Sequence, residues 1–310
     1  MSEKIRELSP ELAKLAKEEL NEVPERISED LEALKEWIRK QPHLRARTSD
    51  QFLVGFLRGC KWSLERAKEK IDSYYTARTV VHEVMSPRDP VLEKNLAIMK
   101  LGYLIPLPET ESPDSPRVVL IRYGCYNPDQ FSIIDVLRVS LMIADLQLAQ
   151  DDNRMCAGET VLVDMENTTM KHFLQLTPVL MKKFAMLTHE ATPVRQKGFH
   201  FFNTAAGFEV AFGAFRNFMK EKVRQRFQVH GNGVESIIKI VPQRILPQEY
   251  GGQAGSISEL LASWEKRLID NREYLMSEEK YGVDESKRIN GKKKEEVYGT
   301  QGSFRKLEID

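Results

Sequence analysis

The sequence has no excess of either charge, because 46 Lys and Arg residues oppose 46 Asp and Glu residues. A zero balance is not typical of a histone-like or ribosomal nucleic-acid binder, nor of an acidic disordered tail. Long apolar runs are also missing: the longest clean one is Val118–Ile121, whereas about 18 residues are needed to span a bilayer. The charged, helix-patterned N-terminus is not typical of a signal peptide. We therefore expect a globular cytoplasmic protein that does not bind nucleic acid.

Cysteine is scarce, and the sequence lacks the common motifs of enzymes. Cys60, Cys125 and Cys156 are far apart and odd in number, which indicates a reducing compartment and argues against a metal cluster. The six histidines show no metal-ligand spacing. Glycine-rich nucleotide loops and the Gly-x-Ser-x-Gly nucleophile motif are absent. We therefore predict no catalytic residues, no cofactor and no metal site, and we expect that the protein is not an enzyme.

A few isolated residues could carry chemistry, but each has a structural interpretation that the sequence favours. Cys60 beside Lys61 could be a reactive thiol, since a nearby cation lowers a thiol pKa; a half-buried helical cysteine is the simpler interpretation. Asp164 and Glu166 end a predicted strand, where α/β proteins often place function, yet a carboxylate there commonly caps the next turn. Structural roles are likewise favoured for two histidines and one glycine-rich turn, namely His200, His230 and Tyr250–Gly255.

The pattern of apolar residues changes along the chain. Apolar residues recur at helical spacing over the first ~85 residues, which predicts a small all-helical module. After the proline-rich stretch 106–116, β-branched runs alternate with helical patterns. Such alternation predicts an α/β domain with a mainly parallel sheet. Strands are expected at 117–123, 159–165, 198–203 and 226–230, and helices at 131–150, 173–187 (interrupted at Pro178) and 207–223.

The zero net charge hides two oppositely charged segments. Residues 1–34 carry five bases and ten acids, whereas residues 182–226 carry nine bases and three acids. Within the second segment a predicted helix combines a basic end with an apolar stripe. The stripe is formed by Phe208, Phe212, Phe215, Met219, Val223 and Phe227. Phe202 and Phe218 add further aromatic side chains. The stripe could close over an apolar ligand, and the bases could hold an anionic membrane. An amphipathic core helix with a solvated basic face explains the same pattern.

Five segments in order carry a resemblance to a known family: Asp50–Ala67, Asp135–Leu141, Thr177–Phe184, Pro193–Asn203 and Ile245–Gly252. The chain from residue 49 to about 274 resembles the CRAL-TRIO lipid-binding family, and within it the α-tocopherol transfer protein-like branch. The last segment, Ile-Leu-Pro-Gln-Glu-Tyr-Gly-Gly, is close to a family hallmark. An ordered set of motifs is far more specific than any single one.

The resemblance implies an α/β fold in which a helical N-terminal module precedes a CRAL-TRIO lipid cage with a mainly parallel sheet and a gating lid helix. The expected divisions are a helical module at 1–90, the lipid-binding domain at 91–255, a C-terminal helix at 256–285 and a disordered tail at 286–310. By position in the family, the ligand pocket is lined by Leu137, Ser140, Ala144, Phe184, Leu187, Thr188, Val194 and Phe199, and the lid carries Phe208, Ala211, Phe212 and Phe215.

The resemblance also implies a basic cleft that reads phosphoinositide headgroups. Its positions fall on Arg195, Lys197, Lys222 and Arg226, all of them basic. A further cleft arginine of the family aligns with Cys60, and the adjacent Lys61 could replace it. The pocket departs from the tocopherol carrier at Ala144, Thr188 and Thr192, so the cargo need not be α-tocopherol.

We therefore expect an intracellular lipid-transfer protein that encloses one apolar ligand, such as a tocopherol (vitamin E), a retinoid or a similar lipid. It would act as a monomer in the cytoplasm and dock transiently on membranes that contain phosphoinositides such as phosphatidylinositol bisphosphate. Two alternatives stay open. One is a phosphoinositide-reading adaptor without net transfer, and the other is an enzyme acting on a lipid.

Overall fold

The computed structural model describes residues 5–205, 208 and 224–289. Its N-terminal part is helical, as predicted, and local signals set the ends of the helices. The Ser9 hydroxyl accepts a hydrogen bond from Leu12 N at the start of the first helix, and Ser63 does the same for Arg66 N. The helices are α1 (Pro10–Leu20), α2 (Ile27–Arg39), α3 (Asp50–Gly59), α4 (Leu64–Val80) and α5 (His82–Met85).

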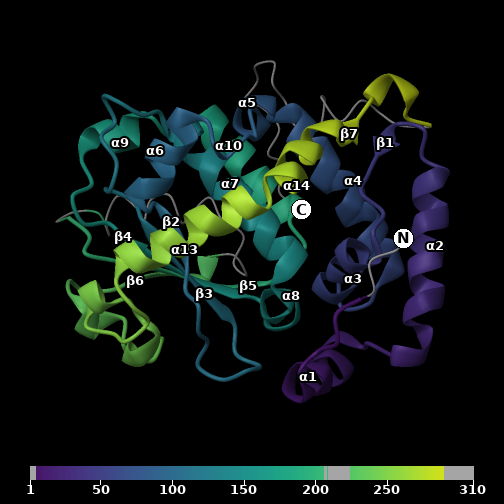
Figure 1. Ribbon diagram of the computed structural model, residues 1–310, viewed down its shortest axis with the longest axis horizontal. Helices are drawn as coiled ribbons and strands as arrows, with labels where there is room; N and C mark the ends of the chain where they lie inside the picture. The colour runs from purple at the N-terminus through teal and green to yellow at the C-terminus, as the bar shows by residue number, and fades with distance from the viewer. Residues whose placement is uncertain (1–4, 206–207, 209–223, 290–310) are drawn as a thin grey trace.

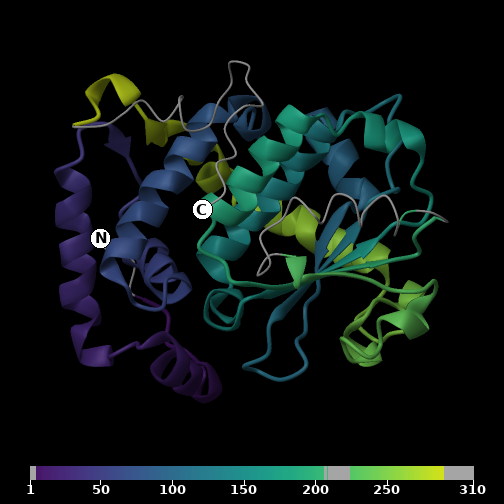
Figure 2. The same cartoon turned by 180° about the vertical axis from the view of Figure 1, so that it is seen from behind.

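Aromatic side chains fill the core of this N-terminal module. The rings of Phe52 and Phe56 have centroids 5.1 Å apart, and the ring of Tyr74 lies edge-on to Phe56 at 5.4 Å. All three side chains are buried. Edge-to-face packing of this kind adds to the burial of apolar area, so α3 and α4 are held together as one unit at one end of the molecule (Figures 1 and 2).

A five-stranded sheet follows, in the order β2-β3-β4-β5-β6. The pairs β3–β4, β4–β5 and β5–β6 are parallel, which confirms the predicted sheet. The sequence did not indicate β2, which is short and pairs antiparallel with β3 at the edge of the sheet. The strands are β2 (Leu104–Pro106), β3 (Arg117–Arg122), β4 (Glu159–Asp164), β5 (Gln196–Phe202) and β6 (Phe227–Val229).

The helices expected at 131–150 and 173–187 are present, whereas the sequence did not indicate the helices at Glu93–Leu101 and Asp152–Ala157. The long helix begins at Ile133, and its N-cap Ser132 forms a reciprocal capping box with Asp135. The interruption expected at Pro178 is confirmed, because one helix ends at Leu174 and the next begins at Pro178. The helices are α6 (Glu93–Leu101), α7 (Ile133–Gln150), α8 (Asp152–Ala157), α9 (Met170–Leu174) and α10 (Pro178–Ala185), and α10 continues into a π-helical turn, η2 (Met186–Ala191).

The two faces of the sheet bury different sets of side chains. Val161 and Val163 of β4 and Phe199 and Phe201 of β5 belong to one large apolar cluster that also includes residues of α7 and η2. Phe202 points to the other face and packs, fully buried, against the segment 234–260. The expectation that Phe202 adds to the aromatic stripe is therefore wrong, because strand alternation turns it away from Phe201.

The C-terminal part returns to the N-terminal module. Helices α13 (Ile257–Asp270) and α14 (Arg272–Ser277) run across the molecule (Figure 1). Strand β7 (Gly282–Val283) then pairs antiparallel with β1 (Leu44–Arg45). Beyond it the Arg288 guanidinium lies 2.7 Å from the Asp72 carboxylate. Within the segment expected to be disordered, Arg288 is thus held against the N-terminal module, whereas Ser286, Lys287 and Ile289 are exposed. Residues 290–310 lie outside the described residues.

A buried ionic cluster joins the N-terminal helices to α7. The Asp145 carboxylate of α7 accepts hydrogen bonds from the guanidinium groups of Arg78 and Arg88, and also from the Tyr74 hydroxyl. Asp145 and Arg88 are 3% and 1% exposed. A buried carboxylate between two cations satisfies what would otherwise be costly isolated charges. The cluster therefore ties the orientation of the N-terminal module to the long helix beside the sheet.

Candidate functional site

A row of phenylalanine rings crosses the edge of the sheet at β5 and β6. Phe199 and Phe227 stack with centroids 4.7 Å apart, and Phe201 lies 6.2 Å from Phe227. Phe208 continues the row at 5.9 Å from Phe201 and 6.5 Å from Phe173 of α9. None of the five rings is fully buried. The row is an apolar surface that remains partly open, which is the kind of wall an apolar ligand needs.

The residues expected to line a ligand pocket lie partly in the apolar core and partly at the surface. Leu137 of α7, Leu187 of η2 and Val194 are buried in the same apolar cluster, against which Phe199 and Phe208 pack. Ala144 is half-buried and Phe184 is 40% exposed on α10. The structure therefore places Leu137, Leu187 and Val194 in the apolar core and Phe184 at the surface.

The hydroxyl groups near this cluster are hydrogen-bonded within their own helical segments. Ser140 Oγ donates to Val136 O at 2.9 Å. Thr188 Oγ1 donates to Phe184 O at 2.9 Å, and Thr192 Oγ1 donates to Leu187 O at 2.7 Å. A hydroxyl satisfied by a nearby carbonyl presents mainly carbon to its other neighbours. The two threonines that depart from the tocopherol carrier therefore add little polarity to the surface.

Of the four residues expected in the lid, only Phe208 lies within the described residues. Phe208 is half-buried against Phe173 and Phe201. Phe227, which the sequence placed on the helical stripe, lies instead in β6. The expected lid residues Ala211, Phe212 and Phe215, together with Phe218 and the expected cleft residue Lys222, lie outside the described residues.

A second feature is a cleft of about 440 Å³ where α3 and α4 meet the segment that enters β5. The two segments can approach closely because Gly59 has no side chain. A Cβ atom added at Gly59 would lie 2.0 Å from the Pro193 carbonyl oxygen. Cations contributed by both sides line the cleft, namely Lys61, Arg66, Lys70 and Arg195. We call this set, together with Lys197 and Arg226, the basic cleft.

The electrostatics show that the predicted cations are close in space. Burial lowers the pKa of Lys197. The positive charges of Arg195, Lys61 and Arg226 lower it further, against an opposing effect of Glu19. Burial also lowers the pKa of Arg195, whose guanidinium donates to Cys156 O. Partly desolvated cations that repel one another favour the binding of an anion.

The basic cleft contains two residues that the sequence prediction missed. Arg66 and Lys70 lie on α4, and Arg66 follows the strained turn in which Lys61 and Trp62 have φ values of 54° and 59°. Their spacing of four residues places them on one face of the helix. That spacing was readable from the sequence, but only the approach of Gly59 to Pro193 puts the same face opposite Arg195.

The other chemical candidates have structural roles. Burial raises the pKa of the Cys60 thiol to about 11, which leaves it protonated at neutral pH. Asp164 accepts hydrogen bonds from Glu166 N and from the Tyr250 hydroxyl. His200 Nδ1 lies 3.0 Å from His230 Nε2.

Among the described residues no group of His, Cys, Asp and Glu is arranged to hold a metal ion. None of the described helices is long and apolar enough to cross a membrane.

Comparisons with known proteins show which domains and relatives this chain is similar to. Residues 23–95 match the profile of the Pinta-like UBA domain, and residues 102–252 match that of the CRAL/TRIO domain. The α-tocopherol transfer protein-like protein of Mus musculus is 31% identical over 272 residues, which cover 87% of this chain and 78% of that protein. Clavesin-2 of Homo sapiens is 27% identical over 282 residues, covering 89% and 83%. The crystal structure of Sfh5 covers 86% of this chain and 100% of its own, at 12% identity and a TM-score of 0.47.

Proposed function

The chain belongs to the CRAL-TRIO family, in its α-tocopherol transfer protein-like branch, and from this membership we propose that it is a lipid-transfer protein. It encloses one apolar ligand and docks on phosphoinositide-containing membranes through the basic cleft. The observation that carries the proposal is the pairing of two surfaces on β5: the partly open row of phenylalanines and, at the start of the same strand, the cations Arg195 and Lys197.

The apolar ligand is supported by the composition of the surface next to the row. Phe199 and Phe208 pack against an apolar cluster that includes Leu137, Leu187 and Val194, and the hydroxyl groups of Ser140, Thr188 and Thr192 are bonded to backbone carbonyls. Each Å² of apolar area that a ligand removes from water there contributes about 25 cal/mol. A tocopherol, a retinoid or a lipid of similar size fits this chemistry.

Docking is supported by charge and by exposed apolar residues. Cations near an anionic membrane contribute ~1 kcal/mol each, and the basic cleft gathers several that share a partly buried setting. On α9 and α10, Met170, Leu174 and Val179 are 70%, 72% and 61% exposed. Large apolar side chains exposed together on neighbouring helices are suited to contact with a membrane.

Transfer also needs a cover that opens. We assign that role to the segment 203–227, which includes the half-buried Phe208 and ends where β6 pairs with β5. Arg226 precedes β6, and its carbonyl oxygen accepts from Phe199 N at 2.7 Å. A headgroup bound at Arg226 therefore contacts the end of this segment directly, and we propose that this contact favours the open form at the membrane.

Charge reversal tests the docking. The triple variant Arg195→Glu, Lys197→Glu and Arg226→Glu should no longer co-sediment with liposomes that contain phosphatidylinositol bisphosphate, because the three new carboxylates cancel the charge of the three remaining bases, Lys61, Arg66 and Lys70. A control with the same change in net charge reverses three exposed lysines in surface ion pairs away from the cleft, Lys40, Lys266 and Lys287. Unchanged binding by the cleft variant, or equal loss in both, would refute the proposed docking.

A transfer assay separates the proposal from its alternatives. A labelled tocopherol or retinoid should move from donor to acceptor liposomes faster with the protein than without it. An adaptor would bind the liposomes without moving the label, and a lipid enzyme would return a chemically changed lipid. Native mass spectrometry of the purified protein, followed by lipid extraction, identifies the cargo.

A further inference from the structure

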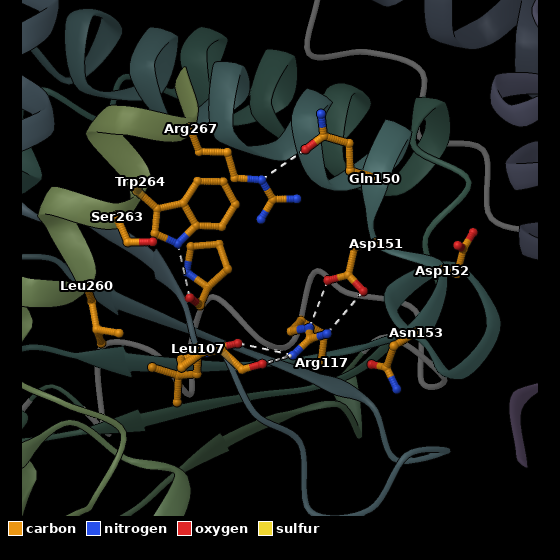
Figure 3. A pocket seen from close by; sticks show the side chains of 12 residues that line it. Leu107, Arg117, Gln150, Asp151, Asp152, Asn153, Leu260, Ser263, Trp264 and Arg267 are labelled. Atoms are coloured by element: carbon orange, nitrogen blue, oxygen red, sulfur yellow. Dashed lines mark hydrogen bonds and ion pairs between the residues drawn. The ribbon is translucent and has the colours of Figure 1, made fainter. Parts of the chain in front are cut away.

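A cleft of about 370 Å³ lies on the side of the sheet where α13 passes the junction of α7 and α8 (Figure 3). One wall is apolar and is formed by Leu107, Leu260 and Trp264, and the other is polar and is formed by Arg117, Gln150 and Arg267. The volume is within the range of about 300 to 1,000 Å³ that is common for small-molecule sites. The lining shares no residue with the basic cleft or with the row of phenylalanines.

Arg267 is the unusual residue of this cleft. Its Nε donates to the neutral amide oxygen of Gln150 at 2.9 Å, and its guanidinium carbon lies 4.6 Å from the centroid of the Trp264 ring. In the described part of the chain no carboxylate comes within ion-pair distance of it. Figure 3 shows the two terminal nitrogens directed into the cleft without a drawn bond. A partly desolvated guanidinium of this kind has two donors available for one planar anion.

The other charged side chains around the cleft already have ion-pair partners, whereas Arg267 has none in the described part of the chain. Arg117 donates to the Asp151 carboxylate through Nε at 2.8 Å and through Nη2 at 3.2 Å. Asp152 accepts from Arg6 at 2.7 Å. Burial lowers the pKa of Arg267, and Arg117 and Arg6 add to this effect, while Asp151 opposes it. The surroundings therefore already disfavour an unneutralised charge on this side chain.

The lining of the cleft also selects among anions. Asp151 and Asp152 are both ion-paired, so the discrimination comes from the apolar wall. Inorganic phosphate has no carbon body to place against Leu107, Leu260 and Trp264, whereas an organic carboxylate has one. We propose that this cleft binds a small organic monocarboxylate, with the carboxylate on the terminal nitrogens of Arg267 and an apolar body against Leu107, Leu260 and Trp264.

The test uses two probes of the same shape, 3-phenylpropionate and its neutral analogue 3-phenylpropionamide. Binding to the full-length protein is followed by the NMR resonance of the Trp264 indole N–H, which donates to Pro106 O at 3.2 Å and is assigned with Trp264→Phe. The carboxylate should shift this resonance saturably. The amide should bind at least about tenfold more weakly, because a charge-assisted bidentate bond is lost.

Arg267→Gln should weaken carboxylate binding by about tenfold or more, and Arg267→Lys should weaken it less, since the charge stays. The matched control is Lys266→Gln, one residue away on the exposed side of α13, where Lys266 pairs with Asp270. Equal affinity for the acid and the amide, unchanged affinity of Arg267→Gln, or equally tight binding of inorganic phosphate would each overturn the proposal. The triple variant of the basic cleft should bind 3-phenylpropionate normally, so failure here is distinguishable from failure of membrane docking.

Discussion

Replacement of Gly59 by alanine probes how the N-terminal module meets the strand that carries the basic cleft. The added Cβ would lie 2.0 Å from the Pro193 carbonyl oxygen and 2.9 Å from its Cβ. Real Cβ atoms do not approach a backbone oxygen this closely, and no side-chain rotation relieves the clash. Helix α3 must therefore move away from residue 193, which also separates Lys61 from Arg195.

The size of the effect follows from a matched variant on the same helix. Gly55→Ala makes only ordinary contact, with Met155 Cε at 3.5 Å, so we expect it to gain up to about 1 kcal/mol from helix propensity. Gly59→Ala gains no more than this and loses about 3 kcal/mol, the upper end of the usual cost of overpacking. Gly59→Ala should therefore be about 2 kcal/mol less stable than the wild type and about 3 kcal/mol less stable than Gly55→Ala.

Urea unfolding of the two variants and the wild type measures this difference. Liposome binding should change in parallel. If Lys61 no longer faces Arg195, the loss of about 1 kcal/mol for one cation weakens binding about fivefold, whereas Gly55→Ala binds as the wild type does. Equal stability of Gly59→Ala and Gly55→Ala would refute the reasoning. It would mean that the backbone can move residue 193 away from the added Cβ atom with no loss in the free energy of unfolding.

Three other predictions concern pH, the buried ionic cluster and the pocket. Burial lowers the pKa of His200 to about 4, below the unfolded value of about 6.5. The unfolded chain therefore binds a proton first, and the free energy of unfolding falls as the pH drops from about 6.5 to 4. His200→Gln should make this fall less steep when urea unfolding is measured across that pH range. Asp145→Asn leaves Arg78 and Arg88 without their shared carboxylate and should lower the free energy of unfolding by about 3–5 kcal/mol. Thr188→Val removes a hydroxyl already bonded within its helix, so ligand affinity in a fluorescence titration should change by less than about threefold, with about 1 kcal/mol lost in stability.

An exposed position supplies one control. Asp270→Asn removes an exposed carboxylate paired with Lys266 and should change stability by no more than about 1 kcal/mol. A pH slope for His200→Gln equal to that of the wild type, or an Asp145→Asn protein as stable as the exposed control, would contradict the corresponding prediction. A large loss of ligand affinity in Thr188→Val would show that the hydroxyl contacts the cargo.

The sequence alone predicted the features that depend on nearby residues. The β-branched runs at 117–123 and 159–165 became β3 and β4, and Pro178 interrupted a helical pattern where expected. These signals are local because a strand needs only its own alternation and a proline acts on its own turn. Arg195 and Lys197 likewise stand two residues apart at the entry to the predicted strand 198–203, so their proximity to each other requires no tertiary contact.

Only the tertiary structure decided which surfaces these elements share. The approach of Gly59 to Pro193 brings Arg66 and Lys70 of α4 to Arg195, more than a hundred residues later in the chain. The pairing of β1 with β7 closes the C-terminal part on the N-terminal module, and the passage of α13 over the α7–α8 junction creates the cleft around Arg267. Each depends on contacts between segments that no local pattern relates, because the favourable energy of such contacts comes from packing and charge in three dimensions.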